Sequence, residues 1–235
     1  MAANKRAGKK SLAQNDYLAP AAPLIATATD VGTSRAFNNG AVTIAFTAQG
    51  PNAATSFTVT SSPGAFTATG SSSPLTVEGL QSDTPYTFTV TATNSAGTSP
   101  ASAASASVTA TTVPATPSAP TASSPSAGVD RITWTAPASG GKAITGYTWA
   151  SSDSKTGTTA SLTVDVAQEQ GTAQTYTVFA TNANGNSGTS AASNSITTTF
   201  SFAPFGAFGF SPFGFSPFGA FGFSPFGFTP SRGPK

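Results

Sequence analysis

The sequence predicts an all-β protein with two tandem β-sandwiches, a short arm before them and a repetitive segment after them. Three observations support this fold class. Short runs rich in Thr, Val, Phe and Ala alternate with Gly, Pro, Asn and Ser; long stretches recur 88 residues apart; and 12 of the 18 phenylalanines fall between Phe200 and Phe228. Runs of this kind are typical of sandwich strands and turns, and a repeat of this length is a domain rather than a solenoid unit.

Residues 1–19 are predicted to be a flexible basic arm. Four positive charges come early, from Lys5, Arg6, Lys9 and Lys10. The segment SLAQNDYLAP follows them, and its polar residues interrupt the apolar core that a secretory signal needs. We therefore expect no export signal of the usual kind. Basic residues are sparse in the rest of the chain, so no nucleic-acid surface is expected either.

The first sandwich is predicted over residues 20–112. Its clearest strand is YTFTVTAT, residues 86–93, where Tyr86, Phe88, Val90 and Ala92 alternate with four threonines. Strict alternation is typical of a strand with one buried and one wet face. This strand should therefore lie over a hydrophobic core.

The second sandwich is predicted over residues 113–199, because the first one recurs there. TFTVTATNSAG (87–97) and TYTVFATNANG (175–185) are identical at seven of eleven positions, and the same offset places Trp134 opposite Phe46. Between the copies, the segment 111–120 contains three prolines. Such a composition favours an extended, semi-stiff connector.

These residues resemble the fibronectin type III family. LQSDTPYTFTVTATNSAGTSPAS (80–102) is similar to the corner, F strand and F–G turn of that family, in which a Leu precedes a corner Tyr by six residues, as Leu80 precedes Tyr86. RITWTAPASGGKAITGYTW (131–149) resembles the B and C strands, with Trp134 as the B-strand Trp. The resemblance implies a hydrogen bond from the corner Tyr to the backbone. In the second copy Gln174 takes the corner position, so this bond is in doubt there. The expected structural core residues are Phe46, Tyr86, Phe88, Trp134 and Tyr176.

The composition argues against an enzyme. The chain has no cysteine and no histidine, which excludes thiolate nucleophiles, Ser-His-Asp triads and imidazole metal ligands. The carboxylates form no calcium-loop pattern, and Glu78, Asp83, Asp165 and Glu169 are expected in solvated turns. Phosphate-binding and nucleophile-elbow motifs are absent. We therefore expect no catalytic residue, cofactor or metal. Phe179, on the outward side of its strand, is a candidate contact residue.

Residues 200–235 form a Phe-rich tail. Residues 203–215 and 216–228 are two copies of a 13-residue unit, identical at 12 positions. The tetrads APFG and SPFG match the preferences of type I turns, and the prolines exclude a continuous helix. A series of turns or extended steps is expected.

This tail is predicted to be an assembly contact. Its phenyl groups, if left in water, would form a larger apolar patch than soluble monomers usually carry. A homo-oligomer or a partner protein is the preferred cover; a membrane span, disordered Phe-Gly repeats and folding back onto the chain's own domains are the alternatives. The prolines disfavour a spanning helix. The expected contact residues are Phe200, Phe202, Phe205, Phe208, Phe210, Phe213, Phe215, Phe218, Phe221, Phe223, Phe226 and Phe228.

The SPFGF and APFG repeats also resemble tails of structural proteins in tailed phages of cyanobacteria and other marine bacteria. This resemblance implies a non-enzymatic virion protein (decoration, fibre or tail surface) that assembles in the host cytoplasm. Its expected partners are other virion proteins and its own copies, with host-surface glycans as a further candidate. A bacterial surface or extracellular-filament protein is the alternative, and an accessory module of a polysaccharide-active enzyme is a weaker one.

Overall fold

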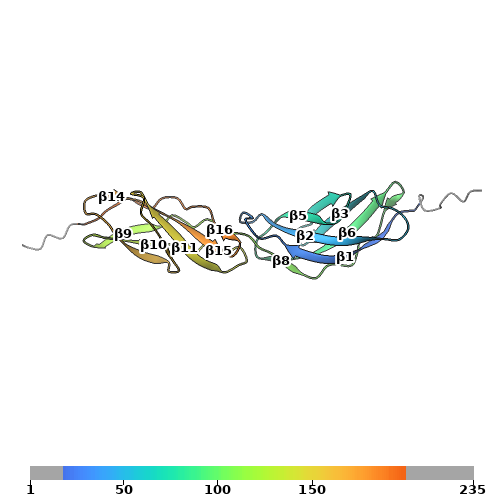
Figure 1. The fold of residues 1–235 in the computed structure, drawn as a ribbon, viewed down its shortest axis with the longest axis horizontal. Coiled ribbons are helices and arrows are strands. Elements are labelled where there is room, and N and C mark those ends of the chain that lie inside the picture. The colour runs from blue at the N-terminus through green and yellow to red at the C-terminus, as the bar shows by residue number, and fades with distance from the viewer. Residues whose placement is uncertain (1–17, 200–235) are drawn as a thin grey trace, which may run out of the picture. The chain divides into compact units, whose positions relative to one another are not determined.

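The computed structural model describes residues 18–199, which form two β-sandwiches without any helix (Figure 1). The prediction of an all-β fold with tandem sandwiches is confirmed for this part of the chain. Most of the predicted arm (residues 1–17) and all of the predicted tail (residues 200–235) lie outside the described residues.

The first sandwich contains two antiparallel sheets. One has the strand order β1-β2-β5, and the other has the order β4-β3-β6-β7, with β8 also paired to β6. The strands are β1 (Ala21–Asp30), β2 (Gly40–Gln49), β3 (Ser56–Ser62), β4 (Thr67–Gly70), β5 (Leu75–Leu80), β6 (Thr84–Asn94), β7 (Gly97–Thr98) and β8 (Val108–Ala110).

Alternation along β6 produces the core of the first sandwich. Tyr86, Phe88, Val90 and Ala92 are buried, whereas the threonines between them are partly exposed. The buried side chains pack against residues of β2, β3 and β5, among them Phe46, whose ring centroid lies 4.9 Å from that of Phe57. One face of each sheet therefore supplies the core, as the period of two requires.

The second sandwich repeats this arrangement. Its sheets have the orders β13-β10-β9 and β12-β11-β15-β16, and β14 pairs with β17. The strands are β9 (Thr121–Ser126), β10 (Val129–Thr133), β11 (Ile144–Ser151), β12 (Thr156–Thr159), β13 (Thr163–Ala167), β14 (Ala173–Gln174), β15 (Tyr176–Asn182), β16 (Gly185–Asn186) and β17 (Ile196–Thr197). A separate core gathers around Ile132, Trp134, Trp149 and Tyr176.

The connector between β8 and β9 begins with two buried threonines. Thr112 is fully buried, and its N–H donates to the carbonyl of Gly140 at 2.8 Å. The next N–H, of Val113, donates to the carbonyl of Arg35 at 3.0 Å. The start of the connector is thus hydrogen-bonded and packed, and does not depend on its prolines alone for rigidity.

Candidate interaction surface on the first sandwich

The structure places the five expected core residues in the two cores. Phe46, Tyr86, Phe88, Trp134 and Tyr176 are each at most 6% exposed. Phe179 is half-buried, and Trp149 joins the core of the second sandwich. The expected assembly contacts, Phe200 to Phe228, lie outside the described residues. Residues of the sandwiches themselves must therefore define any surface seen here.

In the first sandwich the tyrosine corner implied by the family resemblance is present. The hydroxyl of Tyr86 accepts a hydrogen bond from the backbone N–H of Gln81 at 3.0 Å. Tyr86 is 2% exposed, so this bond gives a partner to the hydroxyl of a buried side chain. It fixes the chain between β5 and β6.

The second sandwich has a buried carboxylate instead. Asp130 is fully buried, and its two carboxylate oxygens accept from the hydroxyl of Tyr176 at 2.7 Å and from that of Thr198 at 3.0 Å. Gln168 donates to the Tyr176 hydroxyl at 3.0 Å. Since 88 residues separate the copies, Asp130 and Tyr176 occupy the positions of Val42 and Phe88. A polar pair has replaced an apolar pair at one buried site.

This network changes the chemistry of Tyr176. Burial, and then the hydrogen bond to Asp130, raise the pKa of the tyrosine hydroxyl above its ordinary value. The hydroxyl therefore stays protonated as a donor to the carboxylate. Gln174, at the position of the corner Tyr, accepts instead from the hydroxyl of Ser152 at 2.5 Å.

Two carboxylates expected in solvated turns lie on strands, so that expectation was wrong for them. Glu78 is in β5 and forms an ion pair of 3.0 Å with Arg35. Asp165 is in β13 and accepts from two guanidinium nitrogens of Arg131, at 2.6 and 2.7 Å. The hydrogen bond from Arg131 lowers the pKa of Asp165. These pairs stand across neighbouring strands, and residues 18–199 contain no acidic cluster that could hold a metal ion.

A repeated serine motif borders β6 in the first sandwich. Ser99, Ser102 and Ser105 each contact one residue of β6 through two bonds: the serine N–H donates to a β6 carbonyl, and a β6 N–H donates to the serine hydroxyl oxygen. The partners are Ala92, Val90 and Phe88, at distances of 2.8–3.0 Å. Each hydroxyl then donates to the carbonyl of the following residue. We call this arrangement the serine ladder.

The second sandwich has the same ladder. Ser187, Ser190 and Ser193 bond in the same two ways to Ala180, Val178 and Tyr176 of β15. In both copies the serines are three residues apart and their partners two residues apart. Two strand residues rise about 6.6 Å, so the ladder advances only about 2.2 Å per residue and is wound more tightly than a strand.

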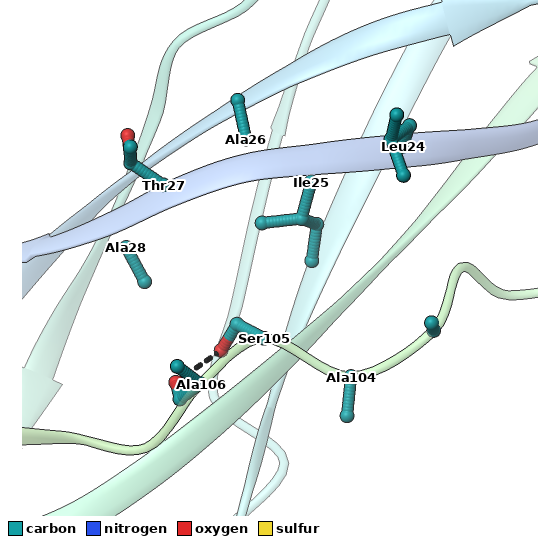
Figure 2. Close-up of a pocket in the computed structure, with 9 residues that line it drawn as sticks. Leu24, Ile25, Ala26, Thr27, Ala28, Ala104, Ser105 and Ala106 are labelled. Carbon is teal, nitrogen blue, oxygen red and sulfur yellow. Dashed lines mark hydrogen bonds between the residues drawn. The ribbon is translucent and has the colours of Figure 1, made fainter.

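An apolar groove lies between β1 and the ladder of the first sandwich. Its lining comes from Leu24–Ala28 and Ala103–Ala106, and its volume is about 170 Å³. In Figure 2, Ile25 and Ala28 point from β1 toward the segment that carries Ser105 and Ala106. A register shift in β1 between Ile25 and Thr27 brings Ile25 and Ala28 to the same side, where both pack on the core. Leu24, 59% exposed, is one of the few large apolar side chains that residues 18–199 leave in water.

The corresponding place in the second sandwich is closed by a side chain. Asn194, which aligns with Ala106, accepts from the N–H of Ala122 and donates to its carbonyl, both at 2.9 Å. The side-chain amide thus ties β9 to the ladder. In the described first sandwich no hydrogen bond joins Leu24–Ala28 to Ala103–Ala106, and the groove stays open there.

The match to a family model agrees with this architecture. The antiparallel sheets with separate cores define a class of two-layer β-sandwich proteins, and residues 29–108 match the family model of the Fibronectin type III domain. The FN1-FN3 domains of chicken CNTN1 align with 77% of this chain and 67% of their own length, at 20% identity and a TM-score of 0.45. Titin kinase and its flanking domains align with 37% of this chain and 17% of their own length, at 29% identity and a TM-score of 0.33. No curated protein matches the sequence.

Proposed function

We propose that this chain is a non-enzymatic structural protein of a tailed phage particle, where its Phe-rich tail docks the subunit and its two sandwiches are displayed. The chain contains a fibronectin type III domain, and such domains are typically binding or structural modules. The particle assignment rests on the resemblance of the SPFGF and APFG repeats to phage structural proteins. The docking role rests on the composition of residues 200–228.

Burial energy carries the docking argument. Each phenyl group removed from water contributes on the order of 1.5–3 kcal/mol, and the segment holds 12 of them without one charged residue. The described sandwiches already have filled cores of their own. The phenylalanines of the tail therefore need a further apolar surface, and an assembled particle supplies many.

The first test removes the tail. A chain that ends after Thr199 should remain folded and monomeric, because both cores lie within residues 18–199. The full chain should assemble, and light scattering at equal concentration compares the two. Equal assembly of the full and shortened chains contradicts the docking role.

The second test addresses the particle. Immunogold electron microscopy of purified phage particles, with an antibody against the first sandwich, should label a regular position on the virion. Mass spectrometry of the same particles should find the chain at a fixed ratio to the major capsid protein. Labelling of bacterial surface filaments, with unlabelled particles, supports the alternative of a surface or filament protein.

A further inference from the structure

We propose that the groove between β1 and the serine ladder of the first sandwich is a receptor for a phenyl ring of the Phe-rich segment 200–228. This inference rests on the proposed docking role of that segment, and it names the surface that the segment binds. The segment itself lies outside the described residues. Three observations support the contact: the open groove, the matching site that Asn194 fills in the second sandwich, and the sequence of residues 200–228.

The size and lining of the groove suit one aromatic ring. A buried apolar cavity of roughly 150 Å³ is large enough to bind benzene, and this groove offers about 170 Å³. Ile25 and Ala28 form its inner side, Leu24 stands exposed at its rim, and no lining residue is charged. A phenyl ring that enters it can contact the side chains of Leu24, Ile25 and Ala28 on one side and the alanines of residues 103–106 on the other.

The chemistry of the segment matches this groove. Phe is the one large side chain in residues 200–228, and the residues directly before and after each Phe within this segment are Gly, Pro, Ala or Ser. Small neighbours let a single ring project into a narrow recess. The 36 residues that follow Thr199 could span up to about 120 Å when extended. This length is sufficient for the segment to reach the groove of a second chain.

The second sandwich has the same fold but no open groove at the matching place, so the fold alone does not produce the groove. Both sandwiches have the ladder, yet Asn194 fills the space that Ala106 leaves open. The matching segment is also less apolar: Ala122 pairs with Ile132 as Ala28 pairs with Ile44, so PSAPTA (117–122) stands where β1 has PLIATA (23–28). An apolar ring gains little there, so the second sandwich is an internal control.

Photo-crosslinking in the full chain tests the inference. Leu24 is replaced by p-benzoylphenylalanine, and in a matched control Leu162, 41% exposed on the second sandwich, is replaced instead. Irradiation of an equal mixture of isotope-labelled and unlabelled chains, followed by peptide mass spectrometry, should find crosslinks from position 24 to residues 200–228 of a second chain. The yield should exceed that of the control on the order of tenfold, the ratio expected for burial of one phenyl group. Crosslinks from position 24 only to another sandwich, or to a different protein, overturn the inference.

Two substitutions close or roughen the groove. Ala106→Asn introduces the residue type that the second sandwich has at this position, Asn194, and Leu24→Ser removes the apolar side chain at the rim. Both positions are exposed, so the melting temperature of the protein should change little. For these variants a second photoreactive residue is placed in the tail, at Phe213, and crosslinks to residues 24–28 are counted. Each substitution should reduce them on the order of tenfold.

A full-length variant with all twelve tail phenylalanines changed to alanine separates the two proposals. If this variant loses assembly but Ala106→Asn and Leu24→Ser keep full crosslinking, the tail docks elsewhere and the groove inference fails alone. If the alanine variant assembles normally, the docking role itself fails. If the alanine variant and both groove variants lose the contact, both proposals stand.

Discussion

The two sandwiches share one scaffold and differ in where they place polar groups. The first buries an apolar pair, Val42 and Phe88, and ties its corner through the Tyr86 hydroxyl. The second buries Asp130 and Tyr176 at the equivalent positions and has no corner Tyr. The serine ladder is present in both. The two copies therefore share the serine ladder along one sheet edge. Their buried polar hydrogen bonds lie at different positions, and both arrangements are compatible with the same fold.

The largest expected effect comes from exchanging these buried pairs. In the second sandwich Tyr176→Phe leaves a buried side-chain oxygen of Asp130 without its donor and should lower the free energy of unfolding by about 1.5–3 kcal/mol. Asp130→Val should cost a similar amount, because it leaves buried hydroxyl groups of Tyr176 and Thr198 without their acceptor. The double variant restores the pair found in the first sandwich and should cost clearly less than the sum. Urea unfolding of all four chains measures the coupling; additive costs contradict it.

The corner is the next point of comparison. Tyr86→Phe should destabilise the first sandwich by about 1–3 kcal/mol, because the backbone N–H of Gln81 loses the hydroxyl of the buried Tyr86 side chain as its acceptor. Gln174 occupies the matching position, and Gln174→Ala removes a side chain that bonds to Ser152 rather than to the corner backbone. Thermal unfolding should therefore show a lower transition temperature of the first sandwich for Tyr86→Phe. Gln174→Ala should leave that transition temperature unchanged. A shift of a few tenths of a kcal/mol for Tyr86→Phe argues against the corner bond.

For the serine ladder we expect equal stability costs in the two sandwiches, whereas the other sites should give different ones. Ser102→Ala and Ser190→Ala each remove the acceptor of one buried strand N–H, that of Val90 or Val178. Each should cost about 1 kcal/mol in its own sandwich. Amide hydrogen exchange should show faster exchange at Val90 or Val178 respectively, with nearby N–H groups unchanged. Unequal costs, or unchanged exchange, contradict a shared role of the serines.

The smallest effect is a difference in alkaline stability. Because the pKa of Tyr176 is raised in the folded state, the folded chain keeps a proton that the unfolded chain loses. Its contribution is fully present below the pKa of a free tyrosine, about 10, and declines as the pH rises beyond it. Tyr176→Phe should flatten this decline between pH 9.5 and about 11. Parallel stability curves for the two chains would show that Tyr176 does not contribute.

Much of the fold could be predicted because alternation and duplication are local patterns. The buried and half-exposed residues of β6 follow the order that YTFTVTAT indicates. The resemblance to the fibronectin type III family, carried in part by the spacing of Leu80 and Tyr86, likewise implied the corner bond that the structure contains. Each of these features depends on neighbours in sequence or on a fixed offset between copies.

The buried carboxylate and the ladder were not predicted, and both had a visible signal. Asp130 aligns with Val42 as Tyr176 aligns with Phe88, and two polar changes at facing buried positions point to one hydrogen bond. The serines recur at a spacing of three, which a search for the two-residue period of strands passes over. The groove depends on the register shift in β1 and on Ala106 opposite it, which only the three-dimensional packing brings together.

The serine ladder has a consequence for edge-to-edge association of β-sheets. An unpaired sheet edge invites another strand to add to it, and proteins held at high local concentration are at risk of merging in this way. Here the outward N–H and C=O groups of Phe88, Val90 and Ala92 are all taken by serines. The backbone beyond them repeats every three residues, so its donors and acceptors do not match an incoming strand with a period of two. The ladder therefore removes this edge of β6 as a template for strand addition, without a charged side chain to protect it.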